Sequence, residues 1–105
     1  MRRGTTPTIT VHITGETFAD STLYVTLRQG NTIITKKNND IIKTVDGENC
    51  TLYVYFSQEE TLSLEQGSAK FQIRWINSNS LAEATRTKTI QVDPVLLEGV
   101  IVYEP

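Results

Sequence analysis

Few residues of this chain have side chains that catalyse reactions or bind metals, and the sequence does not bring them together. His12 is the only histidine, and the alternation around it places it on the outer side of a predicted strand, beside Thr10 and Thr14. A catalytic base needs a nucleophile and an orienting partner close by, and the sequence indicates neither. Cys50 is the only cysteine, so the chain can form neither an intrachain disulfide nor a cysteine-based zinc site. We expect His12 to be an ordinary exposed residue and Cys50 to be an unreactive, packed side chain.

The carboxylates and glycines also lack the spacing of known sites. Acidic residues occur singly in predicted turns, apart from Glu59 and Glu60, and none of them resembles a calcium loop or a glycosidase pair. No glycines stand at the spacing of a phosphate-binding loop. We therefore predict that the protein is not an enzyme and that it has no catalytic residue, cofactor or metal.

The tyrosines point to a different kind of site, because tyrosine is enriched at protein interfaces. Tyr53 and Tyr55 alternate with apolar residues of one predicted strand, so both should face outward. Tyr24 and Ile76 also have outward parity, and together these side chains would make an outer surface apolar enough to pack against another subunit. The simpler interpretation is that tyrosine favours extended backbone and is common on exposed sheets.

Trp75 also has two interpretations. It ends an alternating inward set with Phe71 and Ile73, which indicates a buried indole in the core. The alternative is a sugar-stacking platform at the end of the sheet, because aromatic side chains are common in binding sites.

The elements that would position these residues are strands. From Thr8 to Val92, apolar and polar residues alternate in short runs, a pattern typical of strands with one buried face. Gly30 and the pair Asp46-Gly47 mark tight turns between such runs. The predicted strands cover residues 8–14, 22–29, 32–36, 41–45, 50–57, 69–76 and 84–92. In the last strand two arrangements remain open: a bulge near residues 87–89, or a first half that projects beyond the core at an edge.

One segment departs from this alternation. Ser57 and Glu60 fit a capping box, which predicts a short helical turn over residues 58–62 that crosses from one sheet to the other. Leu62 and Leu64 would then close the end of the core. About seven short strands separated by turns predict an all-β fold, an immunoglobulin-like antiparallel β-sandwich.

The sandwich should span residues 8–93, with an N-terminal arm at 1–7 and an apolar C-terminal tail at 94–105. Exposed apolar surface is costly, so the tail should lie on a neighbouring molecule, add a strand at an exposed edge or fold back over its own sheet. We prefer contact with the Tyr53–Tyr55 surface of a second copy. The predicted interface residues are Tyr24, Tyr53, Tyr55, Leu96, Leu97, Val100, Ile101 and Val102.

Composition limits the other partners. The 105 residues suit one domain, and 38% hydrophobic with 21% charged residues suits a soluble globular protein. The net charge is −2 and the basic residues are scattered, so we expect no nucleic-acid binding. No apolar run approaches the roughly 20 residues of a membrane-spanning helix, and the N-terminus does not resemble a signal peptide.

Several segments resemble a known group of proteins. The opening RRGTTPT (2–8) resembles the start of small proteins encoded in prophage tail regions of Gram-positive bacteria. LYVTLRQG (23–30), FSQEETL (56–62) and FQIRW (71–75) follow in the same order and spacing. The layout is also similar to the immunoglobulin-like N-terminal domain of phage baseplate upper proteins, and the resemblance covers residues 2–92. It implies a virion or tail-assembly component and carries over no catalytic residue.

We therefore expect a non-enzymatic structural module of a phage or prophage tail that binds copies of itself and another tail protein. Such a module would reside in the bacterial cytoplasm during assembly and then in the virion. The alternative is a carbohydrate-binding or adhesion domain that uses Trp75 and the tyrosines.

Overall fold

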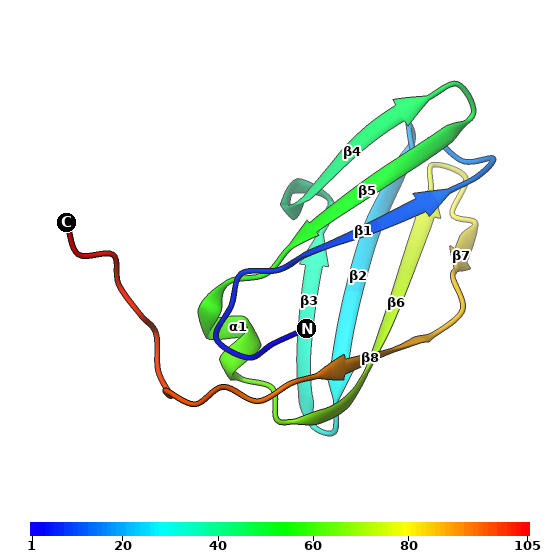
Figure 1. Ribbon diagram of the computed structural model, residues 1–105. Helices are drawn as coiled ribbons and strands as arrows, with labels where there is room; N and C mark the ends of the chain where they lie inside the picture. Colours follow the sequence, from blue (N-terminus) through cyan, green and yellow to red (C-terminus); the bar gives the residue numbers. More distant parts are fainter.

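Two antiparallel sheets pack face to face in the computed structural model, which describes all 105 residues (Figure 1). The smaller sheet has the order β1 (Thr8–Ile13), β5 (Asn49–Tyr55), β4 (Ile41–Asp46). The larger sheet has the order β3 (Thr32–Lys37), β2 (Ser21–Gln29), β6 (Gly67–Asn77), and the far edge of β6 pairs with both β7 (Ala82–Ala84) and β8 (Lys88–Val92). A short 3-10 turn, η1 (Asn38–Asp40), and one helix, α1 (Gln58–Leu62), complete the regular structure. The predicted all-β sandwich is confirmed.

The strand order is that of an immunoglobulin-like sandwich. If β1 is taken as strand B, the smaller sheet contains strands B, E and D, and the larger one contains C′, C, F and G. The chain crosses between the sheets after β1, after β3 and after β5, and it stays within one sheet at the β2–β3 and β4–β5 hairpins. The helical turn therefore crosses from one sheet to the other, as predicted from the capping box.

Inward residues of both sheets form one core. Its largest fully buried apolar members come from β2, β5, β6 and β8 and from two connecting segments: Phe18, Leu23, Val25, Leu27, Leu52, Val54, Leu64, Ile73 and Val92. Phe18 lies in the loop between β1 and β2 with a left-handed φ of 59°, which is unfavourable for an aromatic residue. The Glu16 carboxylate stabilises this loop, since it accepts hydrogen bonds from the amides of Thr17 and Phe18 at 3.0 and 2.8 Å.

The helix begins with the predicted capping box. The Glu60 amide donates to Ser57 Oγ at 3.1 Å, and the Ser57 amide donates to Glu60 Oε1 at 2.9 Å. Lys36 of β3 donates to the same carboxylate at 2.6 Å and so connects the helix to the larger sheet. Burial by itself would raise the pKa of the Glu60 carboxyl, but the hydrogen bonds from Lys36 and Ser57 hold it below its usual value. Leu64 is buried as expected, whereas Leu62 is only partly buried.

The predicted strand 84–92 is interrupted by a bulge. Arg74 of β6 pairs with Ala84, whereas Phe71 pairs with Lys88, so the three-residue step in β6 faces a four-residue step in the partner segment. The extra residue reverses the parity, and Val92 is buried although Ala84 is exposed. Thr85 stabilises the break: its amide donates to Ile73 O at 2.8 Å, and its hydroxyl accepts from the Ile73 amide at 3.1 Å. The structure thus shows the first of the two predicted arrangements, a bulge. It lies between Ala84 and Lys88, slightly earlier in the chain than the predicted position near residues 87–89.

Candidate interaction surfaces

The residues with reactive side chains are isolated from one another. His12 is exposed on the outer side of β1, where its Nδ1 lies 2.9 Å from Thr51 Oγ1, and it forms no ion pair. Cys50 is 2% exposed, and burial raises the pKa of its thiol more than the charge of Lys43 lowers it. Nowhere do three or more His, Cys, Asp or Glu side chains gather closely enough to hold a metal ion. The single α-helix has five residues, and none of the helices could cross a membrane.

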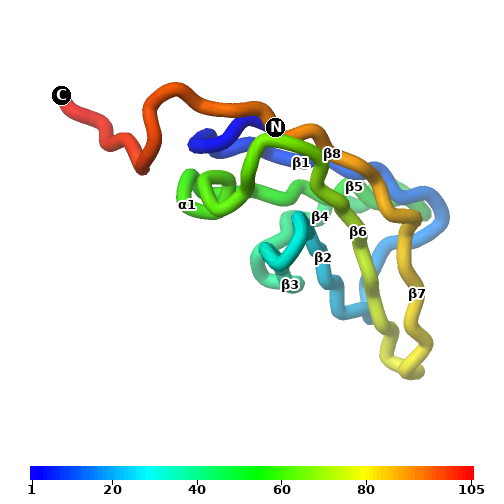
Figure 2. Tube along the Cα trace, turned by 90° about the horizontal axis from the view of Figure 1, so that it is seen from below, coloured from blue at the N-terminus to red at the C-terminus, as the bar shows by residue number.

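The C-terminal tail is the largest set of exposed apolar side chains. It continues from β8 past α1 and extends away from the sandwich without pairing to either sheet (Figures 1 and 2). After the partly buried Val95, exposure of its large apolar residues ranges from 49% at Val100 to complete at Leu96. The exposed set is Leu96, Leu97, Val100, Ile101, Val102 and Tyr103. Five of these six are predicted interface residues, and none of them has a place in the core of its own domain.

The beginning of the tail is nevertheless held in place, chiefly by Arg3. The Arg3 guanidinium donates to Leu64 O at 2.5 Å and to Leu62 O at 3.0 Å, both at the end of α1. It also pairs with Glu98 of the tail, and this hydrogen bond raises the pKa of the guanidinium above its usual value. A side chain of the N-terminal arm therefore connects the helix to the tail.

A second contact holds the tail farther along. Gln58, the first residue of α1, donates from Nε2 to Ile101 O at 3.0 Å and accepts from the Ile101 amide at 2.8 Å. This paired hydrogen bond satisfies the backbone of Ile101 and leaves its side chain 61% exposed. The tail is thus an apolar segment with a defined path over part of its length.

The N-terminal arm is packed against the sandwich and does not extend freely. Arg2 forms a parallel bridge with Asp93, and the Asp93 amide donates to Met1 O at 2.7 Å. Gly4 has a φ of +73°, and a Cβ placed there would lie 3.4 Å from Leu62 and 3.8 Å from Val95. The arm therefore runs closely between α1 and the start of the tail, at a backbone conformation that favours glycine.

Tyr53 and Tyr55 face outward from β5, the middle strand of the smaller sheet, as predicted. Tyr53 lies between Thr10 of β1 and Ile42 of β4, and Tyr55 pairs with Thr8 of β1. The outward positions in the rows of Thr51, Tyr53 and Tyr55 contain no aspartate, glutamate, lysine or arginine, and the first charged outward residue is Asp46, which pairs with Asn49 at the far end of β5. We call this surface the neutral face: Thr8, Thr10, His12, Ile42, Thr44, Thr51, Tyr53 and Tyr55.

Tyr24 lies on the opposite side of the molecule. It is an outward residue of β2 in the larger sheet, paired with Lys37 and Arg74. Because the two sheets pack through their inner sides, Tyr24 and Ile76 do not join Tyr53 and Tyr55 in one surface. The expectation of a common outer surface is therefore wrong.

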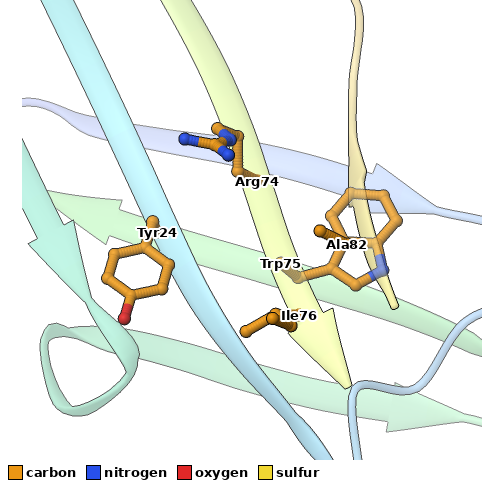
Figure 3. A pocket seen from close by; sticks show the side chains of 5 residues that line it. All are labelled: Tyr24, Arg74, Trp75, Ile76 and Ala82. Carbon is orange, nitrogen blue, oxygen red and sulfur yellow. The ribbon is translucent and has the colours of Figure 1, made fainter. Parts of the chain in front are cut away.

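Tyr24 instead belongs to a shallow pocket of about 270 Å³, the aromatic hollow, lined by Tyr24, Arg74, Trp75, Ile76 and Ala82. Figure 3 shows the ring of Tyr24 face-on beside Ile76, with the indole of Trp75 turned toward β7. Trp75 is only partly buried and packs edge-to-face on Phe18, with ring centroids 5.2 Å apart. The prediction of a buried core tryptophan is therefore correct only in part, because the same indole lines a surface pocket.

A second pocket on this face was not predicted. It has a volume of about 520 Å³ and is lined only by polar side chains, and we call it the cationic hollow: Thr26, Arg28, Lys70, Gln72, Arg74 and Thr87. Arg74 lines both hollows. The sequence contains a signal for the cationic hollow, because Lys70, Gln72 and Arg74 occupy every second position of one strand. That Arg28 lies beside them depends on the pairing of β2 with β6.

The molecule thus belongs to the class of small antiparallel β-sandwiches with three candidate binding elements: the tail, the neutral face and the two joined hollows. No protein-family model matches the chain, and no curated protein is significantly similar to it in sequence.

Proposed function

We propose that this protein is a non-enzymatic structural module of a phage or prophage tail, baseplate-like in its role, that acts through protein–protein contacts. The observation that carries the proposal is the apolar tail, whose apolar side chains are exposed while Arg3 pairs with its Glu98 carboxylate and Gln58 binds its backbone at Ile101. A segment already held in an extended path loses less conformational entropy on binding than a free one. The phage assignment is supported by the resemblance of residues 2–92 to prophage tail-region proteins.

The neutral face of a second copy is the proposed docking surface for the tail. Ile42 and Tyr55 are 52% and 49% exposed there, and an apolar segment can cover them without desolvating a charge. The opposite outer face contains Arg28, Lys70 and Arg74, which would have to lose water. The β7–β8 edge is less suitable, because Lys88 and the neighbouring Arg86 discourage strand addition.

Sedimentation velocity over a range of concentrations tests this proposal. The full chain should self-associate, and removal of residues 95–105 should lower the assembly state while circular dichroism still reports a folded β-protein. Because that deletion also removes Glu98, a second variant with Leu96→Asp and Val102→Asp should weaken association while keeping both tail contacts.

Ile33→Asp provides the matched control, since Ile33 is 57% exposed on β3, where it pairs with the outward Arg28 of the larger sheet, opposite the neutral face. It should leave association unchanged. Tyr55→Asp should also weaken association, because it changes the neutral face on which the tail docks. If the full chain sediments as a monomer at high concentration, the tail packs on its own domain and the self-assembly proposal fails.

In a virion the same surfaces would also serve another tail protein. The proposal places the protein in the bacterial cytoplasm during assembly and in the particle afterwards. Co-purification of the protein with assembled phage particles, tested by mass spectrometry of purified virions, would support this placement. Its absence from particles that contain all other tail proteins would refute it.

The aromatic hollow favours a second candidate function, carbohydrate binding or adhesion. Tyr24 and Trp75 offer aromatic rings beside the apolar Ile76, and Arg74 supplies a charged hydrogen-bond donor. A glycan array probed with the wild type and with Tyr24→Ala tests this candidate. Binding that the variant loses would support it, and the absence of any bound glycan would leave assembly as the function.

A further inference from the structure

We infer that the outer face of the larger sheet binds an acidic oligosaccharide, whose anionic groups occupy the cationic hollow while a sugar ring lies over the aromatic hollow. This inference rests on the second candidate function, carbohydrate binding, and does not depend on assembly through the tail. It names the chemical class of the ligand.

The outer face of the larger sheet is positively charged. The five strands of the larger sheet contain only one acidic residue, Glu83, and four of their six lysine or arginine residues have outward parity, although the whole chain has a net charge of −2: Arg28, Lys37, Lys70 and Arg74. Only two ion pairs exist in the molecule, Arg3–Glu98 and Lys36–Glu60, and neither lies in the hollow. The cations of the hollow therefore have no carboxylate partner.

These cations are also close neighbours. Arg28 pairs directly with Lys70 across β2 and β6, an arrangement in which like charges destabilise a sheet. Within the protein, Arg28 donates to Gly30 O at 3.2 Å and Lys70 donates to Thr89 Oγ1 at 2.7 Å, so both have neutral partners. An anion bound between them would remove the repulsion. The sheet thus favours the bound state electrostatically.

The cations are spread over a length of the sheet. Lys70 and Arg74 are four residues apart on one strand, roughly 13 Å. Arg28 is on the neighbouring strand, roughly 5 Å from Lys70 between Cα atoms. With Lys70 bonded to Thr89 and Arg28 bonded to Gly30 O, a single small anion would have to draw these side chains away from their partners to contact all three. An extended molecule with repeated negative groups can do so.

Neutral polar and aromatic side chains lie beside the cations. Thr26, Gln72 and Thr87 supply neutral hydrogen-bonding groups suited to sugar hydroxyls. The two hollows share Arg74, which Figure 3 shows projecting from β6 above Tyr24. Lys37 lies 5.6 Å from the centroid of the Tyr24 ring and helps to fix it. An acidic sugar chain carries anionic groups and the apolar faces of its sugar rings at adjoining positions.

Charge density separates this ligand from nucleic acid. A nucleic-acid duplex carries one negative charge per roughly 1.7 Å, and its strong binding requires many more phosphate contacts than the three cations of the cationic hollow supply. An acidic oligosaccharide with at most one charge per sugar needs only the few cations present.

Isothermal titration calorimetry with oligogalacturonate, compared with a neutral oligosaccharide such as cellohexaose, tests the inference on the full chain. We expect oligogalacturonate to bind, and its affinity to fall as salt is raised. Arg74→Gln and Lys70→Gln should each weaken binding roughly tenfold. Arg74→Lys should retain most of the affinity, and Tyr24→Ala should weaken it through loss of the ring contact.

Lys43→Gln is the matched control, because it removes the same charge from an exposed edge of the other sheet and should not change affinity. Equal binding of both oligosaccharides would overturn the inference while leaving carbohydrate binding intact. Equal or tighter binding of poly-glutamate would show generic attraction of anions and would also overturn it. Failure of both oligosaccharides to bind would refute the inference, whereas the second candidate function fails only if the glycan array also shows no bound glycan.

Discussion

Replacing Ile73 by alanine should remove a large part of the stability of this sandwich. Ile73 is fully buried in the middle of β6, the strand that pairs with β2 on one side and with β7 and β8 on the other. The substitution deletes three carbon atoms, worth about 2.4 kcal/mol at about 0.8 kcal/mol per buried carbon group. It also leaves a cavity that the rigid pairing on both sides of β6 cannot close. We expect the free energy of unfolding to fall by about 3 kcal/mol, within the range of about 2–5 kcal/mol for such truncations.

Ile76→Ala separates burial from strand propensity. Ile76 lies three residues farther along the same strand but faces outward and is 39% exposed. Ile76→Ala is the same chemical change as Ile73→Ala and likewise removes a β-branched residue, yet it removes little volume from the core. The expected cost is about 1 kcal/mol or less.

Urea denaturation followed by tryptophan fluorescence measures both variants, because Trp75 packs on the buried Phe18. For Ile73→Ala we expect a clearly lower midpoint at unchanged slope, and a melting temperature lower by roughly 10–20 °C. Equal midpoints for the two variants would show that the inward and outward faces of β6 are wrongly assigned.

Three further predictions follow from individual residues. Cys50 should react slowly with a thiol reagent in the native state and rapidly in denaturant, because burial raises its pKa; equal rates would mean that β5 is displaced or exposed. Unfolding free energy should fall as the pH drops below about 4.5, the ordinary pKa of a glutamate. The folded-state pKa of Glu60 is lowered, so its stabilisation is complete above the unfolded-state value and is lost as protonation proceeds through the folded-state value. Glu60→Gln should make the acid side of the stability curve less steep, and an unchanged slope would contradict the role of its contact with Lys36. Arg3→Gln should speed hydrogen exchange of the tail amides around residue 101, and unaltered protection would show that the Arg3–Glu98 contact does not hold the tail.

Much of the architecture could be predicted from local patterns. The alternation correctly placed Cys50 and Ile73 inside and Tyr53 and Tyr55 outside, because side-chain direction in a strand depends only on position parity. The capping box was equally predictable, since its reciprocal hydrogen bonds join two residues three positions apart. These features depend on the backbone of a single segment.

The bulge shows where a local pattern is insufficient. Residues 84–92 contain polar and apolar side chains at both parities, so the sequence alone permitted two arrangements. Pairing of β6 with β7 and β8 in two registers decided between them, with Thr85 supplying side-chain hydrogen bonds at the break. Trp75 is a similar case: its parity was read correctly, but its partial exposure depends on how the short β7 covers the end of β6.

By itself the sequence determined the strands, their inner and outer faces, the capped helical turn and the apolar character of the tail. Only the tertiary structure decided which outward side chains lie on the same face. It placed β2 and β5 in different sheets and so separated Tyr24 from Tyr53 and Tyr55. It also brought Arg28 opposite Lys70 and Arg3 to Glu98, which is 95 residues away in the chain. Periodicity predicts whether a side chain points inward or outward. The neighbours of that side chain depend on strand pairings, which only the packing of the whole chain selects.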